Sequence, residues 1–358
     1  MSKGTFQNYQ HYLPATYIRR FKITSEDPKA GKDTVYGFVK KDATKEQVKK
    51  RITFLNVTKI CGQERRHTLN IEGVRDNFIE DTFKILEDCY PGFVDTMWQF
   101  YKMKENFKNA SGSHYFVRRH CLFGDLALKK FARSIVCSGL HEIDFNDLKN
   151  MAIFMARFLC YRNKSMDYFF DKSPMPKLKN INTIIKEVLN TNKDLIPYGA
   201  SIIPRSEWKS LLSILKEGGE YLVNADSRQR REMFHVLRKM HRFMALPFSS
   251  IANESGCRAY LYSAPKGCAI VSSDFPFIFF KNDFSFGNGC IFTISPRLAL
   301  IFKSAKITLS KPEKLSNLIS MRNVIQARQY VFSVEKERLD IFTKDITPIL
   351  TESYGKRK

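Results

Sequence analysis

The sequence lacks the features that tie a protein to a membrane or to an oxidising compartment. It contains no apolar run of about 18 residues, and Met1–Pro14 has no apolar core followed by small residues. The eight cysteines form no CxxC pair and have no regular spacing, so we expect reduced thiols rather than disulfides. These absences predict a cytoplasmic protein with neither a spanning helix nor a secretory signal.

Several familiar catalytic motifs are missing as well. No G-x-S-x-G occurs, and no Walker or Rossmann glycine pattern follows a predicted strand, which argues against serine hydrolysis and NTP hydrolysis. Asp274 and Lys281 lack the middle acid of a metal-dependent nuclease. His114, His120 and Cys121 lack the paired spacing of zinc ligands. We therefore predict no metal and no cofactor.

The charge balance indicates an anionic partner. Lys and Arg total 59 against 36 Asp and Glu, a formal net charge of +23. A field of that sign attracts phosphate, so nucleic acid is the first candidate partner and an anionic membrane surface the second. The basic residues are spread along the whole chain, which leaves a Lys-rich composition without a dedicated groove as the alternative.

Chain length limits the number of domains. A chain of 358 residues with 30 Phe and 15 Tyr can bury a large core. Domains usually contain about 100–200 residues, so we expect two, with Ser173–Pro176 as the linker between 1–172 and 177–354. One continuous domain is the alternative. The oligomeric state stays open.

Short apolar runs near the C-terminus predict a sheet. Turn-forming residues separate these runs, and the short gaps favour hairpins over helical crossovers. The predicted strands of this region are Arg258–Ser263, Cys268–Ser272, Phe275–Phe280 and Cys290–Ile294. Further strands are expected at Val35–Lys40, Ile52–Thr58 and Tyr330–Ser333. The sheet should therefore be mainly antiparallel.

Helical spacing of apolar residues dominates the N-terminal half and the middle of the chain. It begins at Ile71, continues to Tyr101 with a break at Pro91, and recurs over Leu128–Val136 and after Asp144. A helix over Ser316–Tyr330 precedes the last strand. We therefore predict an α+β fold, with a helical N-terminal and middle region packed on a mainly antiparallel C-terminal sheet.

The predicted helix Ser227–Leu246 has the sharpest basic face in the chain. At about 100° per residue, its polar side gathers Arg228, Arg231, His235, Arg238, Lys239 and Arg242. Phosphate contact and a merely solvated face are both open for these residues. The interval from Arg228 to His235 is similar to the Arg–His signature of HEPN ribonucleases. The β-rich region that follows does not belong to an all-helical HEPN domain.

Four stretches of sequence, in the same order, resemble the bacterial family catalogued as domain of unknown function 4238. They are QHYLPATYIRRF, MAIFMARFLCYRN, VSSDFPF with TISPRLALI, and RNVIQARQYVFS. The matching residues are His11, Pro14, Arg19, Phe21, Arg162, Ser273, Asp274, Pro276, Ser295, Pro296, Asn323, Ala327, Tyr330 and Ser333. Phe275 replaces the Asn usual in that family.

The resemblance implies a biological role rather than a reaction. Members of that family occur in prophages and phage satellites and are associated with defence against phage. It therefore implies an antiviral protein whose partner is nucleic acid or a phage component rather than a membrane.

The matching residues suggest a catalytic site. If the N-terminal segment and the last helix dock on the sheet, His11, Arg19, Asp274 and Asn323 would surround one cleft. A His, a carboxylate, an Arg and an amide suit acid–base work on a phosphate or glycosidic bond. The alternative is a binding protein in which these residues are structural and Asp274 closes its own turn. A solvent-open cleft favours catalysis, whereas full burial with every group paired favours structure.

Overall fold

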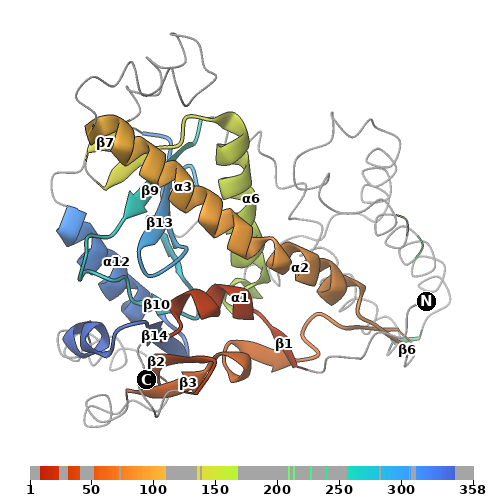
Figure 1. Ribbon diagram of the computed structural model, residues 1–358. Helices are drawn as coiled ribbons and strands as arrows, with labels where there is room; N and C mark the ends of the chain where they lie inside the picture. Colours follow the sequence, from red (N-terminus) through yellow and green to blue (C-terminus); the bar gives the residue numbers. More distant parts are fainter. Residues whose placement is uncertain are drawn as a thin grey trace. The chain divides into compact units, whose positions relative to one another are not determined.

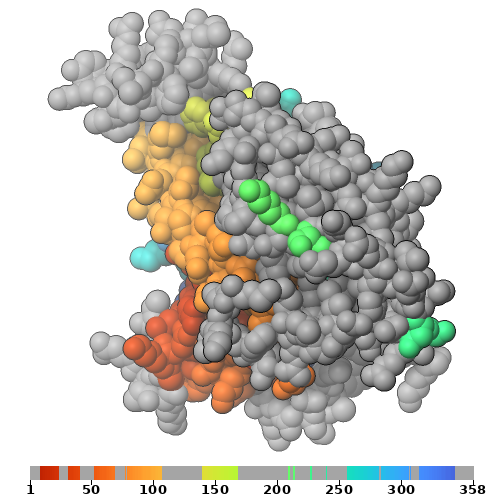
Figure 2. Space-filling model, turned by 90° about the vertical axis from the view of Figure 1, so that its right-hand side faces the viewer, coloured from red at the N-terminus to blue at the C-terminus, as the bar shows by residue number. Residues whose placement is uncertain are grey.

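The structure is a computed structural model. Between 168 and 255 it describes only a few separate residues, which are drawn as green spheres in Figure 2. The residues that it describes are 9–23, 31–40, 52–71, 74–109, 135–137, 139–167, 209, 213, 226–227, 239, 256–281, 284–305, 307 and 312–342.

The chain forms two compact units, each built from separate segments. The first contains 1–12, 62–88 and 154–253, and the second contains 13–61, 89–153 and 254–358. The predicted linker Ser173–Pro176 and most of the predicted middle helices lie outside the described residues.

A six-stranded antiparallel sheet forms the centre of the second unit. Its strand order is β11-β12-β13-β9-β8-β7. The strands are β7 (Ile135–Cys137), β8 (Leu140–Glu142), β9 (Arg258–Ser263), β11 (Phe277–Phe279), β12 (Cys290–Thr293) and β13 (Leu298–Lys303). Strands β11, β12 and β13 follow one another as hairpins, as their short connections predict.

The two faces of this sheet carry different side chains because neighbouring residues of a strand point in opposite directions. On one face, Tyr17 of α1 (Ala15–Ile18) stacks on Phe292, with 6.2 Å between ring centroids. α3 (Tyr90–Asn109) runs past β9 (Figure 1), and its Tyr90 hydroxyl donates to the carbonyl of Ile294 at 2.6 Å. On the other face, Ile319 of α12 (Pro312–Gln326) belongs to the apolar cluster that includes Ile291.

A second sheet in this unit has the order β10-β14-β2-β3. It contains β2 (Thr34–Val39), β3 (Thr53–Asn56), β10 (Ser272–Ser273) and β14 (Tyr330–Ser333). The prediction of Cys268–Ser272 as a strand beside its sequence neighbours was wrong. Only Ser272 and Ser273 form a strand. They pair with β14, and the N–H of Asp274 continues the pairing by donating to the carbonyl of Tyr330 at 2.9 Å.

The described residues of the first unit include two short strand pairs, one α-helix and the end of another. β1 (Tyr9–His11) pairs with β4 (Gly62–Glu64), and β5 (Leu69–Ile71) pairs with β6 (Val74–Asp76). α2 (Phe78–Asp88) belongs to this unit, as do the residues of α6 (Asn146–Arg162) from Phe154 onward.

Two helical predictions fail where strands form instead. Ile71 lies in β5, and the helix begins only at Phe78, because β5 pairs with β6 where the helical spacing begins. Ile135 and Val136 were predicted at the end of a helix but lie in β7, which pairs with β8 at the end of the large sheet.

The α+β fold class is confirmed, and every strand pair within the described residues is antiparallel. No described helix has both the length and the apolar composition that crossing a bilayer requires. The described residues also contain no group of His, Cys, Asp and Glu side chains that could hold a metal ion. His114, His120 and Cys121 lie outside them.

Candidate functional site

His11 lies in the first unit, where its backbone is fixed from two sides. It is the last residue of β1 and pairs with Gly62 of β4. Its carbonyl accepts a hydrogen bond from Nε of Arg162 at 2.7 Å. Two of the stretches that carry the family resemblance therefore meet here, at the backbone of His11 rather than at its ring.

Arg162 is the centre of a buried charge cluster in the same unit. Its side chain is fully buried and forms ion pairs with Glu87 and, at 3.7 Å, with Glu80. The guanidinium lies 5.1 Å from the ring centroid of Phe83. Burial raises the pKa of Glu80 to about 7; Arg162 opposes the shift and Glu87 adds to it. A carboxyl group that titrates near neutral pH can take up or release a proton under physiological conditions.

Arg19 is in the second unit and points to a surface partner. Its Nε donates to a carboxylate oxygen of Asp33 at 2.9 Å, and 45% of its side chain is exposed. Asp274 accepts hydrogen bonds from backbone N–H groups after α12, and Asn323 donates to Val271 and Thr293. The bonds that the structure shows therefore do not link Arg19 with either residue.

Asp274 holds the turn between α12 and β14. Its two carboxylate oxygens accept hydrogen bonds from the N–H groups of Arg328, at 3.0 Å, and Gln329, at 2.8 Å. Only 3% of the residue is exposed. Burial raises its pKa, and the backbone N–H groups and Lys40 oppose that shift. The local turn is closed by the Ser273 hydroxyl, which accepts from the N–H of Phe275, so the bonds of Asp274 described here reach beyond the predicted Asx turn.

Lys40 binds the other side of the same turn. Its ammonium donates to the carbonyls of Val324, Ile325 and Ala327 at 3.1, 2.5 and 2.8 Å. These carbonyls belong to the end of α12 and the residue after it, where a helix leaves carbonyls without partners. Burial lowers the pKa of Lys40 to about 8, and the charge of Asp274 opposes that shift.

Asn323 is enclosed in the second unit. It is fully buried, and its amide donates to the carbonyl of Val271 at 2.9 Å and to the Thr293 hydroxyl at 3.0 Å. Burial and pairing of this kind favour a structural role for Asn323 and Asp274 over access to a substrate. The catalytic assignment of His11, Arg19, Asp274 and Asn323 stays a prediction.

Of the predicted basic face, the structure describes Lys239 alone. Its ammonium donates to the carbonyl of Thr68 at 2.7 Å, within the first unit. The remaining members, Arg228, Arg231, His235, Arg238 and Arg242, lie outside the described residues. Their phosphate contacts stay a prediction.

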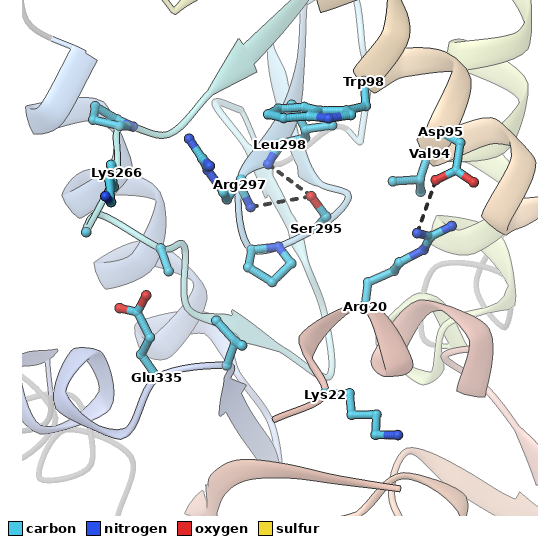
Figure 3. Close-up of a pocket in the computed structure, with 15 residues that line it drawn as sticks. Arg20, Lys22, Val94, Asp95, Trp98, Lys266, Ser295, Arg297, Leu298 and Glu335 are labelled. Atoms are coloured by element: carbon cyan, nitrogen blue, oxygen red, sulfur yellow. Dashed lines mark hydrogen bonds and ion pairs between the residues drawn. The ribbon is translucent and has the colours of Figure 1, made fainter. Parts of the chain in front are cut away.

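A pocket of about 460 Å³ opens in the second unit between residues 20–22, α3 and the loops of the sheet. Figure 3 shows the residues that line it, with Trp98, Ser295 and Arg297 close together and the Lys22 side chain pointing away from them. Four cationic residues line it, and they are Arg20, Lys22, Lys266 and Arg297. Its acidic residues are Asp95, which pairs with Arg20 at 3.2 Å, and Glu335. The pocket therefore carries an excess of positive charge.

Trp98 of α3 supplies an aromatic wall to this pocket. The Arg297 guanidinium lies 5.6 Å from the centre of the indole, and the ring of Tyr101 stacks on it with 5.5 Å between centroids. These contacts hold the indole in place, because a cation over an aromatic face and a stacked ring are both favourable.

The floor of the pocket is a tight turn that belongs to the third stretch of the family resemblance. The Ser295 hydroxyl accepts hydrogen bonds from the N–H groups of Leu298, at 3.1 Å, and Arg297, at 3.4 Å (Figure 3). Pro296 lies between Ser295 and Arg297 in the sequence. This bonding projects Arg297 at the tip of the β12–β13 hairpin.

Sequence reasoning did not identify this pocket. Trp98 fits the apolar stripe of a helix, and Lys22 and Lys266 are two among 59 basic residues. The only available signal was the resemblance at Ser295 and Pro296. Convergence of Trp98 with the cations depends on contacts among distant segments, which a local pattern does not contain.

Comparisons with protein-family models, with curated proteins and with solved structures find no match to this chain.

Proposed function

We propose that this protein is an anti-phage defence protein that binds a nucleotide unit, free or within a single strand of nucleic acid, in the pocket around Trp98. The proposal takes its antiviral context from the family resemblance. Its chemistry comes from one observation, the convergence of cationic side chains on a pocket with an indole wall.

The charges of the pocket suit phosphate. Arg20 is engaged by Asp95, but within the described residues the ammonium groups of Lys22 and Lys266 form no ion pair. Flexible ammonium groups and a guanidinium are the usual partners of phosphate oxygens. Glu335 is the one carboxylate that opposes the remaining cations.

The size of the pocket suits a base, which would share the indole with the Arg297 guanidinium, 5.6 Å from the ring centre, and with the stacked ring of Tyr101. Stacking of a base on an aromatic side chain contributes about 1–3 kcal/mol, whichever base is present. Pockets for small molecules usually measure about 300–1,000 Å³, and this one, at about 460 Å³, lies in that range. A double helix would not enter such a pocket, whereas one nucleotide would.

Binding without chemistry is the form of the proposal that the geometry favours. Asp274 and Asn323, the residues expected to act on a substrate, are buried and bonded to the protein itself. A nucleotide pocket on a defence protein would serve to recognise a phage-derived strand or an infection-dependent nucleotide in the cytoplasm.

Tryptophan fluorescence tests the proposal directly, since the chain contains two tryptophans. In a Trp208→Phe background the signal comes from Trp98 alone. We expect adenosine 5′-monophosphate to quench it at concentrations about 10- to 150-fold lower than adenosine, because charge-assisted hydrogen bonds contribute about 1.5–3 kcal/mol. Inorganic phosphate alone should bind weakly. Equal affinity for the nucleotide and the nucleoside, or no quenching by either, would refute the proposal.

Matched variants connect binding with defence. The double variant Lys22→Gln/Lys266→Gln should lose the preference for the phosphorylated ligand and should also lose protection in a phage plaquing assay. Lys314→Gln, an exposed lysine that does not line the pocket, serves as the control. Protection that survives the double variant would separate the pocket from the defence function.

A further inference from the structure

A second cavity of the second unit has a different chemistry. It measures about 460 Å³ and lies between α12 and strands β11, β12 and β13. Its floor is a row of isoleucines, since Ile278 is the register partner of Ile291, and Ile291 that of Ile301. The three branched side chains lie in line on one sheet face, and α12 already covers most of them, since they are 3–8% exposed and share a buried cluster with Ile319.

The wall opposite this floor is the apolar side of α12. It contributes Leu315, Leu318 and Ile325 to the lining. Leu318 is 44% exposed, and Phe280, at the end of β11, is 50% exposed. Both are thus large apolar side chains left in contact with water at the cavity, which costs free energy that a bound apolar group would recover.

Two cations interrupt the apolar lining. Lys303 extends from the end of β13, with its ammonium 5.9 Å from the centre of the Phe280 ring, and Arg322 extends from α12 and is exposed. Neither forms an ion pair with another described residue. The lining contains no acidic side chain, so these charges are complementary to an anion alone.

A peptide strand is a poor occupant of this cavity. β11 ends the six-stranded sheet, and an added strand would need its free carbonyls. The amide of Gln326 already donates to the carbonyls of Phe275 and Phe277 at 3.1 and 2.6 Å. The edge is therefore covered by α12 at the point where a peptide would pair.

We propose that this cavity binds a long-chain carboxylic acid, with the hydrocarbon chain over Ile278, Ile291 and Ile301 and the carboxylate at Lys303 and Arg322. A concave apolar space that holds a few polar groups is the usual form of a small-molecule site. The site is independent of the pocket around Trp98, and none of its lining residues is shared with that pocket.

Calorimetric titration of the full chain tests the proposal with amphiphiles of matched length, each kept below its micellar concentration. We expect dodecanoate to bind saturably and about tenfold more tightly than dodecyltrimethylammonium. Lys303→Gln/Arg322→Gln should abolish this difference, so that both amphiphiles bind with the weaker affinity that apolar contacts alone provide. Equal affinity of the wild-type protein for both amphiphiles would mean an adventitious apolar contact and would overturn the proposal. So would the absence of saturable binding, which is the result expected if the cavity serves a protein helix instead.

Surface variants locate the bound molecule. Leu318→Gln should weaken dodecanoate binding about three- to tenfold, because it places an amide on the cavity wall. The exposed position of Leu318 makes this substitution compatible with folding, which thermal melting checks. Ile341→Gln is the control, since Ile341 is 47% exposed but does not line the cavity. An unchanged affinity in both Leu318→Gln and the double variant would place the ligand elsewhere and overturn the assignment.

Discussion

Lys40 and Asp274 bind opposite polar sides of one turn, the turn that joins α12 to β14. Lys40 donates to three carbonyls at the end of the helix, whereas Asp274 accepts from two N–H groups that follow it. Both residues are buried. Together they satisfy backbone groups that would otherwise be enclosed without partners, at a place where three stretches of the chain meet.

The first prediction concerns Lys40→Met, which keeps the length of the side chain and removes its donors. Carbonyls at the end of α12 would then be buried without that partner, and we expect a loss of about 1–3 kcal/mol in the free energy of unfolding. Urea denaturation measures it. Lys314→Met, at an exposed position of α12, should change stability by less than about 0.5 kcal/mol. Similar stabilities of the two variants would contradict the role given to Lys40.

Asp274→Asn separates the structural role from the catalytic one. An amide can accept from one of the two N–H groups but presents a donor to the other, so we expect a loss of about 1–3 kcal/mol and a lower melting temperature. Protein that remains folded should still protect cells from phage. A variant of unchanged stability that has lost protection would instead support catalysis by Asp274. Asp33→Asn, which breaks the surface pair with Arg19, should cost at most about 1 kcal/mol.

His11→Gln tests another of the four catalytic candidates. Arg162 binds the carbonyl of His11, and the substitution keeps that bond. It removes the edge contact between the His11 and Tyr9 rings, whose centroids are 5.4 Å apart, so we expect a small fall in melting temperature. If the ring transfers a proton, protection in the plaquing assay should disappear. Full protection by a stable variant would exclude His11 from any chemical step.

Local parts of this fold could be predicted from the sequence. The helical turn after Pro14 buries Tyr17, Ile18 and Phe21 as the spacing indicates, and β14 has the predicted bounds. Such features depend on neighbours in the chain, because proline geometry and side-chain periodicity act over a few residues.

Long-range pairings account for what the sequence could not supply. β10 is only two residues long, and it takes its place from β14, which lies almost sixty positions later. Lys40 binds carbonyls that are 284 to 287 positions away. A lysine at the end of a strand is usually a solvated residue, so nothing local to Lys40 identifies its partners.

Glu80→Gln should change how stability depends on pH. The folded-state pKa of Glu80, about 7, lies above its ordinary value of 4.5, so the folded protein binds the proton more tightly than the unfolded chain. The wild type therefore loses stability as the pH rises from about 4.5 to 7, by about 1–3 kcal/mol. Gln cannot ionise, so the variant should lack this loss and gain on the wild type across the interval.

Denaturation series at several pH values measure this difference. Asp88→Asn, at the exposed end of α2, is the control and should follow the wild-type curve between pH 4.5 and 7. Parallel curves for Glu80→Gln and the wild type would show that Glu80 does not titrate in this range.

The salt dependence of binding shows whether single-stranded nucleic acid binds at the pocket around Trp98 or at the predicted helix Ser227–Leu246. Each phosphate contact contributes about 0.7 to the slope of log affinity against log salt concentration, because binding releases condensed counterions. Lys22→Gln/Lys266→Gln should therefore reduce the magnitude of the slope by about 1.4. Arg228→Gln/Arg231→Gln/Arg238→Gln should leave it unchanged if the pocket around Trp98 is the site. A slope that falls only in the triple variant would assign the strand to the predicted helix Ser227–Leu246 and would remove polymer binding from the pocket.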